Sequence, residues 1–215
     1  KFTEFHHYDC DVMTVNPSKK SPWSFIYTNE WKDFICGMMP DIPVTNDIMS
    51  EIQYHPVGTN NGWIHNDFDA SHFVHDPLPN GLNPWFKNSQ YRLEKPPTDP
   101  NIITTCRSIV CIYYLDDKLN WKEGDGGETG LYDSENDNVD EPIMKINPVP
   151  NRLLVYEINP WSWHSFISNK VHERVSMIMW YHTSPQDTNE RYGHTGVSAY
   201  GKVDAITNKD KDGKS

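Results

Sequence analysis

Three segments dense in β-branched and aromatic residues constrain the fold of this 215-residue chain more than any other feature. They are residues 106–115 (CRSIVCIYYL), 151–158 (NRLLVYEI) and 173–182 (ERVSMIMWYH), and a shorter strand-like segment, 126–133 (GGETGLYD), lies between the first two. Proline, glycine and asparagine separate these segments, and such residues form turns. A succession of short strands favours a closed or sandwiched β core over a parallel α/β sheet.

The N-terminal half adds a predicted helix and a long connection. Apolar residues in 23–40 recur with the spacing of an amphipathic helix, for which Thr28 or Asn29 is the expected N-cap. Residues 47–58 are expected to lead into the first core strand. Residues 68–103 are rich in Pro, Asn and Asp and lack a strong period, which predicts a long connection. A connection of this length in a compact domain is usually functional, as a lid or a binding loop.

We expect one mainly β domain over residues 1–182, with its core at 50–182 and an insertion at 68–105. Residues 183–215 are predicted to form a C-terminal extension that is partly flexible, because the apolar pattern ends there. The chain begins with Lys1 rather than Met, so we expect that the natural N-terminus lies further upstream.

Composition limits the partners of the chain. The 19 Lys and Arg residues against 30 Asp and Glu give a formal charge of −11, which repels phosphate backbones and disfavours nucleic acid. The sequence has no apolar run long enough to cross a bilayer and no signal-peptide pattern, so no membrane partner is expected. Its 4 cysteines form no CxxC pair, which favours a reducing cytoplasm. The oligomeric state stays open.

The segment GWIHND (62–67) places His65 and Asp67 two residues apart in a predicted strand, where alternate side chains share a face. A histidine and a carboxylate on one face are two ligands of a facial triad, and the third is expected to be a histidine from a distant strand. His164, in the short aromatic strand 161–167, is the best candidate. Either histidine taken alone is as consistent with an ordinary packed or surface residue.

His72 and His75 offer a weaker alternative, as a pair of ligands at i and i+3 on a helical turn. The remaining histidines are expected to be ordinary packed or solvated residues: His6, His7, His55, His172, His182 and His194.

Arg174 follows His164 by ten residues and opens an apolar strand, with Ser176 on the same face. An arginine that points into a β core is costly unless it meets an anion. Its guanidinium fits a carboxylate through two hydrogen bonds, and a serine hydroxyl can donate a third. Beside a metal site, this predicts a ligand that chelates at one end and carries an acid at the other. The alternative for Arg174 is a salt bridge to Glu157 or Glu128.

The ordered set HxD, YYL, GGET, NRLLVY, a distal histidine and a following arginine resembles the Fe(II)/2-oxoglutarate-dependent oxygenases of the prolyl 4-hydroxylase branch, over residues 50–182. The resemblance implies a double-stranded β-helix (a jelly-roll or cupin-like core) with a flanking N-terminal helix. It implies iron held by His65, Asp67 and His164, and Arg174 bound to the 5-carboxylate of 2-oxoglutarate.

Three further residues match positions of the family around the cosubstrate. Tyr114, the second tyrosine of YYL, is expected to hydrogen-bond the same carboxylate as Arg174. Tyr54 is expected to line the cosubstrate pocket, and Thr129 of GGET to lie near it.

The resemblance implies a hydroxylase that uses Fe(II), 2-oxoglutarate and O2, releases succinate and CO2, and leaves ascorbate open as a further cofactor. Asp67 is present where related halogenases carry a small residue, which favours hydroxylation. The expected substrate is a prolyl residue in a protein or peptide. A hydroxylase of a free amino acid or small metabolite is the first alternative, and a non-catalytic cupin-like metal-binding or ligand-binding module is the second.

The segment between Asp67 and the strand at 106–115 is longer than in compact prolyl hydroxylases. Its aromatic residues are candidates for a lid over a small molecule or for a peptide groove, and a surface insertion without function is the alternative. These aromatic residues are Phe73, Trp85, Phe86 and Tyr91.

Overall fold

The computed structural model describes residues 3–5, 10–15, 17, 22–85, 90–91, 98–116 and 120–196. In chain order its elements are β1 (Thr3–Phe5), β2 (Cys10–Thr14), the 3-10 helix η1 (Ser24–Tyr27), α1 (Asn29–Cys36), β3 (Asp47–His55), β4 (Ala70–Val74), β5 (Asn83–Pro84), β6 (Gln90–Tyr91), β7 (Ile102–Tyr114), β8 (Thr129–Leu131), β9 (Met144–Ile146), β10 (Leu153–Glu157), β11 (His164–Phe166), β12 (Arg174–Thr183) and α2 (Pro185–Tyr192).

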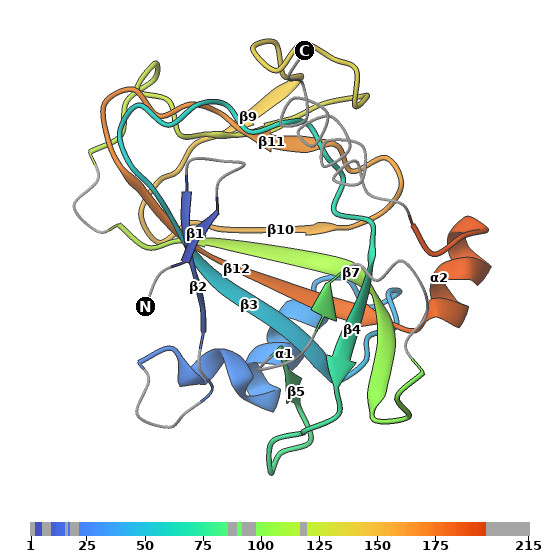
Figure 1. Cartoon of the computed structure of the whole chain (residues 1–215). Coiled ribbons are helices and arrows are strands. Elements are labelled where there is room, and N and C mark those ends of the chain that lie inside the picture. Colours follow the sequence, from blue (N-terminus) through green and yellow to red (C-terminus); the bar gives the residue numbers. More distant parts are fainter. Residues whose placement is uncertain are drawn as a thin grey trace, which may run out of the picture.

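Two sheets form the body of the molecule (Figure 1). The larger has the order β1-β2-β3-β12-β7-β4-β6, with β10 beside β7 and β5 beside β3, and the smaller has the order β11-β8-β9. Residues 62–65 continue the smaller sheet beyond β11: the Gly62 amide donates to the Phe166 carbonyl (2.8 Å), and His65 and His164 exchange backbone hydrogen bonds. The layers β3-β12-β7-β10 and 62–65-β11-β8-β9 together form the predicted double-stranded β-helix.

Strand β12 is central to the larger sheet, because it pairs along its length with β3 on one side and with β7 on the other. Met177 and Met179 belong to the core on the α1 side, whereas Ile178 and Trp180 belong to the core between the two sheets. Burial of both faces explains why this segment reads as a continuous apolar run rather than as an alternating one.

The predicted helix over 23–40 is two helical segments in the structure. Thr28 separates η1 from α1 because its backbone is extended (φ −106°, ψ 152°). Its hydroxyl accepts a hydrogen bond from the Trp31 amide at 3.3 Å, so the predicted N-cap is confirmed. Figure 1 shows α1 against the face of the larger sheet opposite the smaller sheet.

The connection predicted over 68–103 contains strands. β4 pairs with β7, and β5 pairs with β3. Phe73 is fully buried, with its ring 5.1 Å from that of Trp85, so the lid role expected for Phe73 is wrong. These strands are short and are separated by segments that contain proline, so they produce no clear period in the sequence. Phe86 and the side chain of Tyr91 lie outside the described residues.

The segment after residue 182 forms helix α2, capped by the Ser184 hydroxyl and ended at Gly193, where φ is 79°. The Tyr192 ring packs against that of Phe68 at 5.2 Å, which fixes the end of α2 beside the loop that follows Asp67. Residues 197–215, part of the extension predicted to be flexible, lie outside the described residues. Among the helices that the structure describes, none has both the length and the apolar character needed to span a membrane.

Candidate active site

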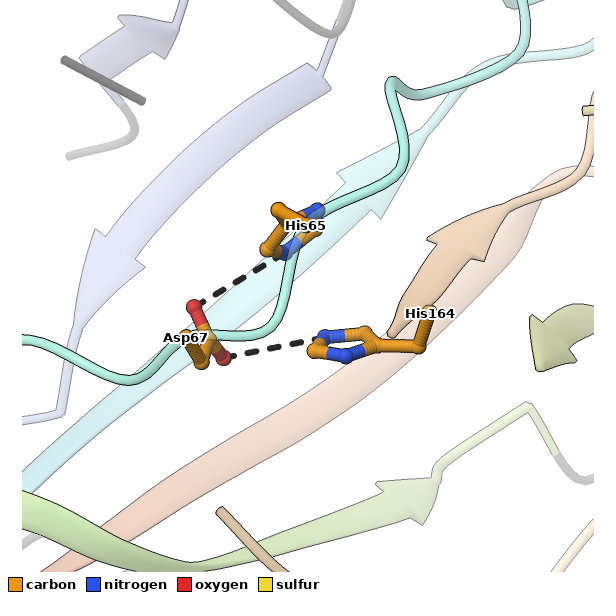
Figure 2. Close-up of side chains that lie close together, drawn as sticks. All are labelled: His65, Asp67 and His164. Atoms are coloured by element: carbon orange, nitrogen blue, oxygen red, sulfur yellow. Dashed lines mark ion pairs between the residues drawn. The ribbon is translucent and has the colours of Figure 1, made fainter. Parts of the chain in front are cut away.

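His65, Asp67 and His164 come together between the two sheets (Figure 2). One ligand atom from each lies within 4.8 Å of the others, and all three residues are buried. The Nε2 atoms of His65 and His164 are each 3.7 Å from a different oxygen of Asp67. These separations are too long for hydrogen bonds but suit ligands around one ion.

Both histidines are held in the tautomer that a metal requires. The Nδ1 atom of His65 is 3.0 Å from the Trp63 carbonyl oxygen, and that of His164 is 2.9 Å from the Ser162 carbonyl oxygen. A carbonyl can only accept, so each Nδ1 carries the proton and each Nε2 presents its lone pair to the site. Burial, assisted by the nearby His164, lowers the pKa of His65 to about 3, which keeps this ring neutral.

A tight turn, rather than a regular strand, brings His65 and Asp67 together. His65 forms an isolated β-bridge, and Asp67 has φ 58°, in the left-handed region. The predicted alternation along a strand is therefore wrong for this pair. Asn66 holds the turn, because its side chain accepts from the Phe68 amide (3.1 Å) and donates to the Pro160 carbonyl (3.1 Å).

Two donors hold the Asp67 carboxylate. Arg107 Nη1 donates to Oδ1 at 2.8 Å, and Trp180 Nε1 donates to Oδ2 at 2.8 Å. Burial opposes ionisation, but the positive charge of Arg107, supported by the Trp180 hydrogen bond, brings the pKa of Asp67 down to about 2. Arg107 was missed from sequence; the available signal was an arginine inside an otherwise apolar strand, a position that demands an anion.

Arg174 is buried at the start of β12, in the same pocket as the metal ligands. Its guanidinium donates to the Gly127 carbonyl at 3.1 Å and to Thr129 Oγ1 at 3.5 Å. The rings of Tyr114 and Phe166 each lie 5.1 Å from its Cζ. The cation is therefore enclosed by aromatic rings and neutral acceptors.

The alternative salt bridge from Arg174 to Glu157 is not formed, because Glu157 pairs with Arg191 at 2.6 Å. Glu128 acts on Arg174 through its charge, and no ion pair within 4.0 Å joins the two within the described part of the chain. The Arg174 Nε–H has no hydrogen-bond partner among the described residues.

Other buried polar groups near Arg174 also lack a hydrogen-bond partner among the described residues: the hydroxyls of Ser176 and Tyr156, and Nδ1 of His55. Tyr156 and His55 line the pocket, and Ser176 follows Arg174 on the same face of β12. Buried donors without partners are costly, so this cluster is suited to an anionic ligand with several acceptor oxygens. A dicarboxylic keto acid fits this set of donors.

Tyr114 lies beside Arg174, and Thr129 lies near the pocket as expected. Thr129 lines the pocket, and its Oγ1 is 2.9 Å from the Tyr114 hydroxyl. Thr129 therefore links Tyr114 to Arg174 in one network.

Tyr54 does not line the pocket. Its hydroxyl donates to Glu173 Oε2 at 2.7 Å on the outer side of β3, whereas Gln53 and His55 line the pocket. A shift of one residue moves a strand side chain to the other face, which is why this prediction is wrong. His55, predicted to be ordinary, stacks on Phe166 with 4.1 Å between ring centroids, and burial followed by the Arg174 charge lowers its pKa to about 2.

The alternative metal pair His72 and His75 is also wrong in its local structure. His72 lies on β4 rather than on a helical turn, and its Nδ1 is 3.0 Å from Thr104 Oγ1. His75 lies just beyond the end of β4, where its backbone amide donates to the Asn101 carbonyl at 2.9 Å, so the two residues do not share a helical turn. Among the described residues, the only cluster of three or more potential metal ligands is that of His65, Asp67 and His164.

Comparisons with known proteins agree with this geometry. The profile of the 2OG-Fe(II) oxygenase superfamily matches residues 95–182. Over 102 residues the chain is 32% identical to a protein of Ostreococcus tauri named prolyl 3,4-dihydroxylase OGFOD1; the alignment covers 45% of this chain and 20% of that relative. The chain thus corresponds to a small part of the relative's length.

Solved structures share the fold. A prolyl 4-hydroxylase of Pseudomonas putida matches with a TM-score of 0.52 and 12% identity, covering 85% of this chain and 77% of that chain. A prolyl hydroxylase of Trichoplax adhaerens, solved with a peptide fragment of the hypoxia inducible factor oxygen degradation domain, matches with a TM-score of 0.50 and 17% identity, covering 85% and 66%. The predicted fold and the resemblance to the 2OG-Fe(II) oxygenases are confirmed.

Proposed function

We propose that this chain is an Fe(II)- and 2-oxoglutarate-dependent dioxygenase that hydroxylates a prolyl residue in a protein or peptide. One observation carries the proposal. The ligand set His65, Asp67 and His164 shares a buried pocket with Arg174, whose Nε–H has no partner among the described residues.

The residues present fit the metal and the cosubstrate. Two neutral imidazoles and one carboxylate are the ligand set of non-heme iron oxygenases, and they leave coordination positions open for other ligands. Arg174 and the Ser176 hydroxyl would bind the distal carboxylate of 2-oxoglutarate, with Tyr114 and Thr129 supporting that end. When bound, iron, 2-oxoglutarate and O2 supply the oxidation that converts C–H into C–OH, with release of succinate and CO2.

The chain's own contribution is to bind, orient and exclude water. The aromatic rings around Arg174 and the burial of the three ligands keep the site dry, which strengthens each polar contact in it. A module that binds only a metal has no use for a buried arginine without an anion, so Arg174 favours the oxygenase over the binding module.

A prolyl substrate is supported by the relatives, which are named prolyl hydroxylases or a prolyl dihydroxylase, one of them solved with a peptide. A free amino acid or small metabolite stays the alternative substrate, with ascorbate as an added reductant in either case. The substrate assay below distinguishes these two classes.

Succinate formation tests the proposal. The purified chain is incubated with Fe(II), 2-oxoglutarate, ascorbate and air, alone and with either proline-containing peptides or free amino acids. We expect succinate, and a gain of one oxygen atom in the mass of a prolyl peptide. Arg174→Ala is assayed beside these samples, and Arg152→Ala, which changes an exposed arginine, is its control. Absence of succinate under every condition, together with tight Zn(II) binding, would favour the binding module instead.

A further inference from the structure

The Asp67 carboxylate accepts hydrogen bonds from side chains on two strands of the larger sheet. Arg107 comes from β7 and Trp180 from β12, and each donates to a different oxygen at 2.8 Å. The same two oxygens face His65 and His164, at 3.7 Å from each Nε2. Each oxygen therefore has a protein donor and also faces a histidine of the candidate metal site.

A carboxylate without such donors would turn freely, because the torsion about the Cβ–Cγ bond of aspartate has a broad energy profile. Donors on both oxygens fix the plane of the group. This matters for Asp67 because its backbone is left-handed, so a regular strand does not set the direction of its side chain.

The two donors also fix one another. The Arg107 guanidinium carbon lies 4.4 Å from the centroid of the Trp180 ring. Arg107 Nη2 is 3.5 Å from Met49 Sδ, and the Arg107 backbone amide donates to the Asp69 carbonyl at 3.1 Å. Both side chains are buried, so the pair is a rigid support rather than a surface contact.

We propose that Arg107 and Trp180 are positioning residues that set the orientation of the Asp67 carboxylate, and thereby the affinity and ligand field of the metal site. The inference rests on the proposed function, since it assumes that Asp67 binds a divalent metal. It assigns a role to two residues that the proposed function leaves without one.

Two conservative variants separate orientation from charge. Trp180→Phe removes one neutral donor but keeps an aromatic ring beside Arg107, and Arg107→Lys keeps the positive charge but loses the planar fork. Since loss of a group that orients a metal ligand typically weakens metal binding by about 10- to 100-fold, we expect that loss of Co(II) affinity in each variant. We also expect altered Co(II) absorption bands, which report the ligand field.

Matched controls are Trp31→Phe, which removes an indole donor to Met179 Sδ near α1, and Arg152→Lys at the surface. Both should bind Co(II) as the unmodified chain does. The melting temperature of each metal-free variant is measured beside the titration. If Trp180→Phe and Arg107→Lys leave the Co(II) affinity and the Co(II) absorption bands unchanged, the inference is overturned, even if both variants have lower melting temperatures.

The unmodified chain provides a test that needs no variant. A crystal structure with Co(II) bound should retain both hydrogen bonds to Asp67, and a carboxylate turned away from either donor overturns the inference. If the unmodified chain binds no Co(II) at all, the proposed function fails first, so the two failures are distinguishable.

Discussion

At the scale of single residues, the candidate site consists of buried polar groups whose partners are incomplete. Arg174, Ser176 and Tyr156 each bury a donor that meets no acceptor among the described residues. A folded chain retains such groups at a cost, and a bound anion would remove that cost. The prediction of an anion-binding arginine from its place in an apolar strand follows the same logic.

Replacing Arg174 by alanine should weaken the binding of 2-oxoglutarate and leave metal binding unchanged. Loss of a charge-assisted pair costs about 2 kcal/mol, or roughly a 30-fold rise in the dissociation constant. Calorimetric titration of the Co(II)-loaded protein with 2-oxoglutarate measures this dissociation constant. An unchanged constant in Arg174→Ala would remove this residue from the cosubstrate site.

His65→Ala or His164→Ala should abolish metal retention, since each removes one of three protein ligands. Metal content after gel filtration of the Fe(II)-loaded or Co(II)-loaded protein is the measurement. His72→Ala is the control, because His72 on β4 contacts Thr104 on β7 and is not a member of the candidate metal cluster. Equal metal loss in all three variants would show that the effect is not specific to the cluster.

At the scale of elements, the glycines before β8 determine where Arg174 finds its acceptors. Gly126 and Gly127 have φ values of 81° and 83°, and the Gly127 carbonyl accepts from Arg174. A Cβ on Gly126 would lie 2.0 Å from the Ser168 carbonyl oxygen. The two glycines of GGET are therefore required by backbone conformation, and at Gly126 also by the close approach of a second chain segment.

Gly126→Ala should destabilise the protein more than Gly124→Ala does. Both glycines have positive φ, so alanine costs about 1–2 kcal/mol at either position. Gly124 has no atom within 4 Å of its added Cβ, whereas Gly126 meets backbone. Urea unfolding compares the two, and the Gly126 variant should also bind 2-oxoglutarate more weakly. Equal unfolding free energies would show that the loop moves away without cost.

At the scale of the whole molecule, several buried histidines stay neutral in the fold. Burial is the main cause that lowers the pKa of His55 to about 2, that of His65 to about 3, and that of His182 well below its usual 6.5. Unfolding returns these rings to water, where they take up protons below pH 6.5. Glu51 has the opposite effect on proton uptake, because burial raises its pKa from 4.5 to about 7 and the folded state therefore binds its proton more tightly than the unfolded state does.

The metal-free protein should therefore lose stability on acidification below pH 6.5. Between pH 6.5 and pH 4.5 the three histidines are protonated in the unfolded state but not in the folded state. Over the same range Glu51 is protonated in the folded state but not in the unfolded state. The net uptake on unfolding is about two protons, so the unfolding free energy should fall by about 2.7 kcal/mol per pH unit in this window. Glu51→Gln should steepen the slope, as measured by urea unfolding at several pH values. A flat profile would contradict the neutral state of the buried histidines.

The order of the chemical groups along the chain was readable from sequence, because strand alternation and motif spacing are local properties. These local properties were enough to predict the β core, the N-cap at Thr28, the place of Arg174 in the pocket of the metal ligands and the place of Tyr114 beside Arg174. Tyr54 shows the limit: the strand was expected, but its face depends on a register that pairing with β12 decides.

Only the tertiary structure decided which distant groups meet. β7 and β12 bring Arg107 and Trp180 to Asp67, and the pairing of β11 with residues 62–65 brings His164 to His65. These contacts join residues far apart in the chain, and closing such loops depends on the packing of both sheets together rather than on any local preference. The sequence by itself therefore specified the ligands and the arginine, while the closure of the two sheets specified their geometry and the support for Asp67.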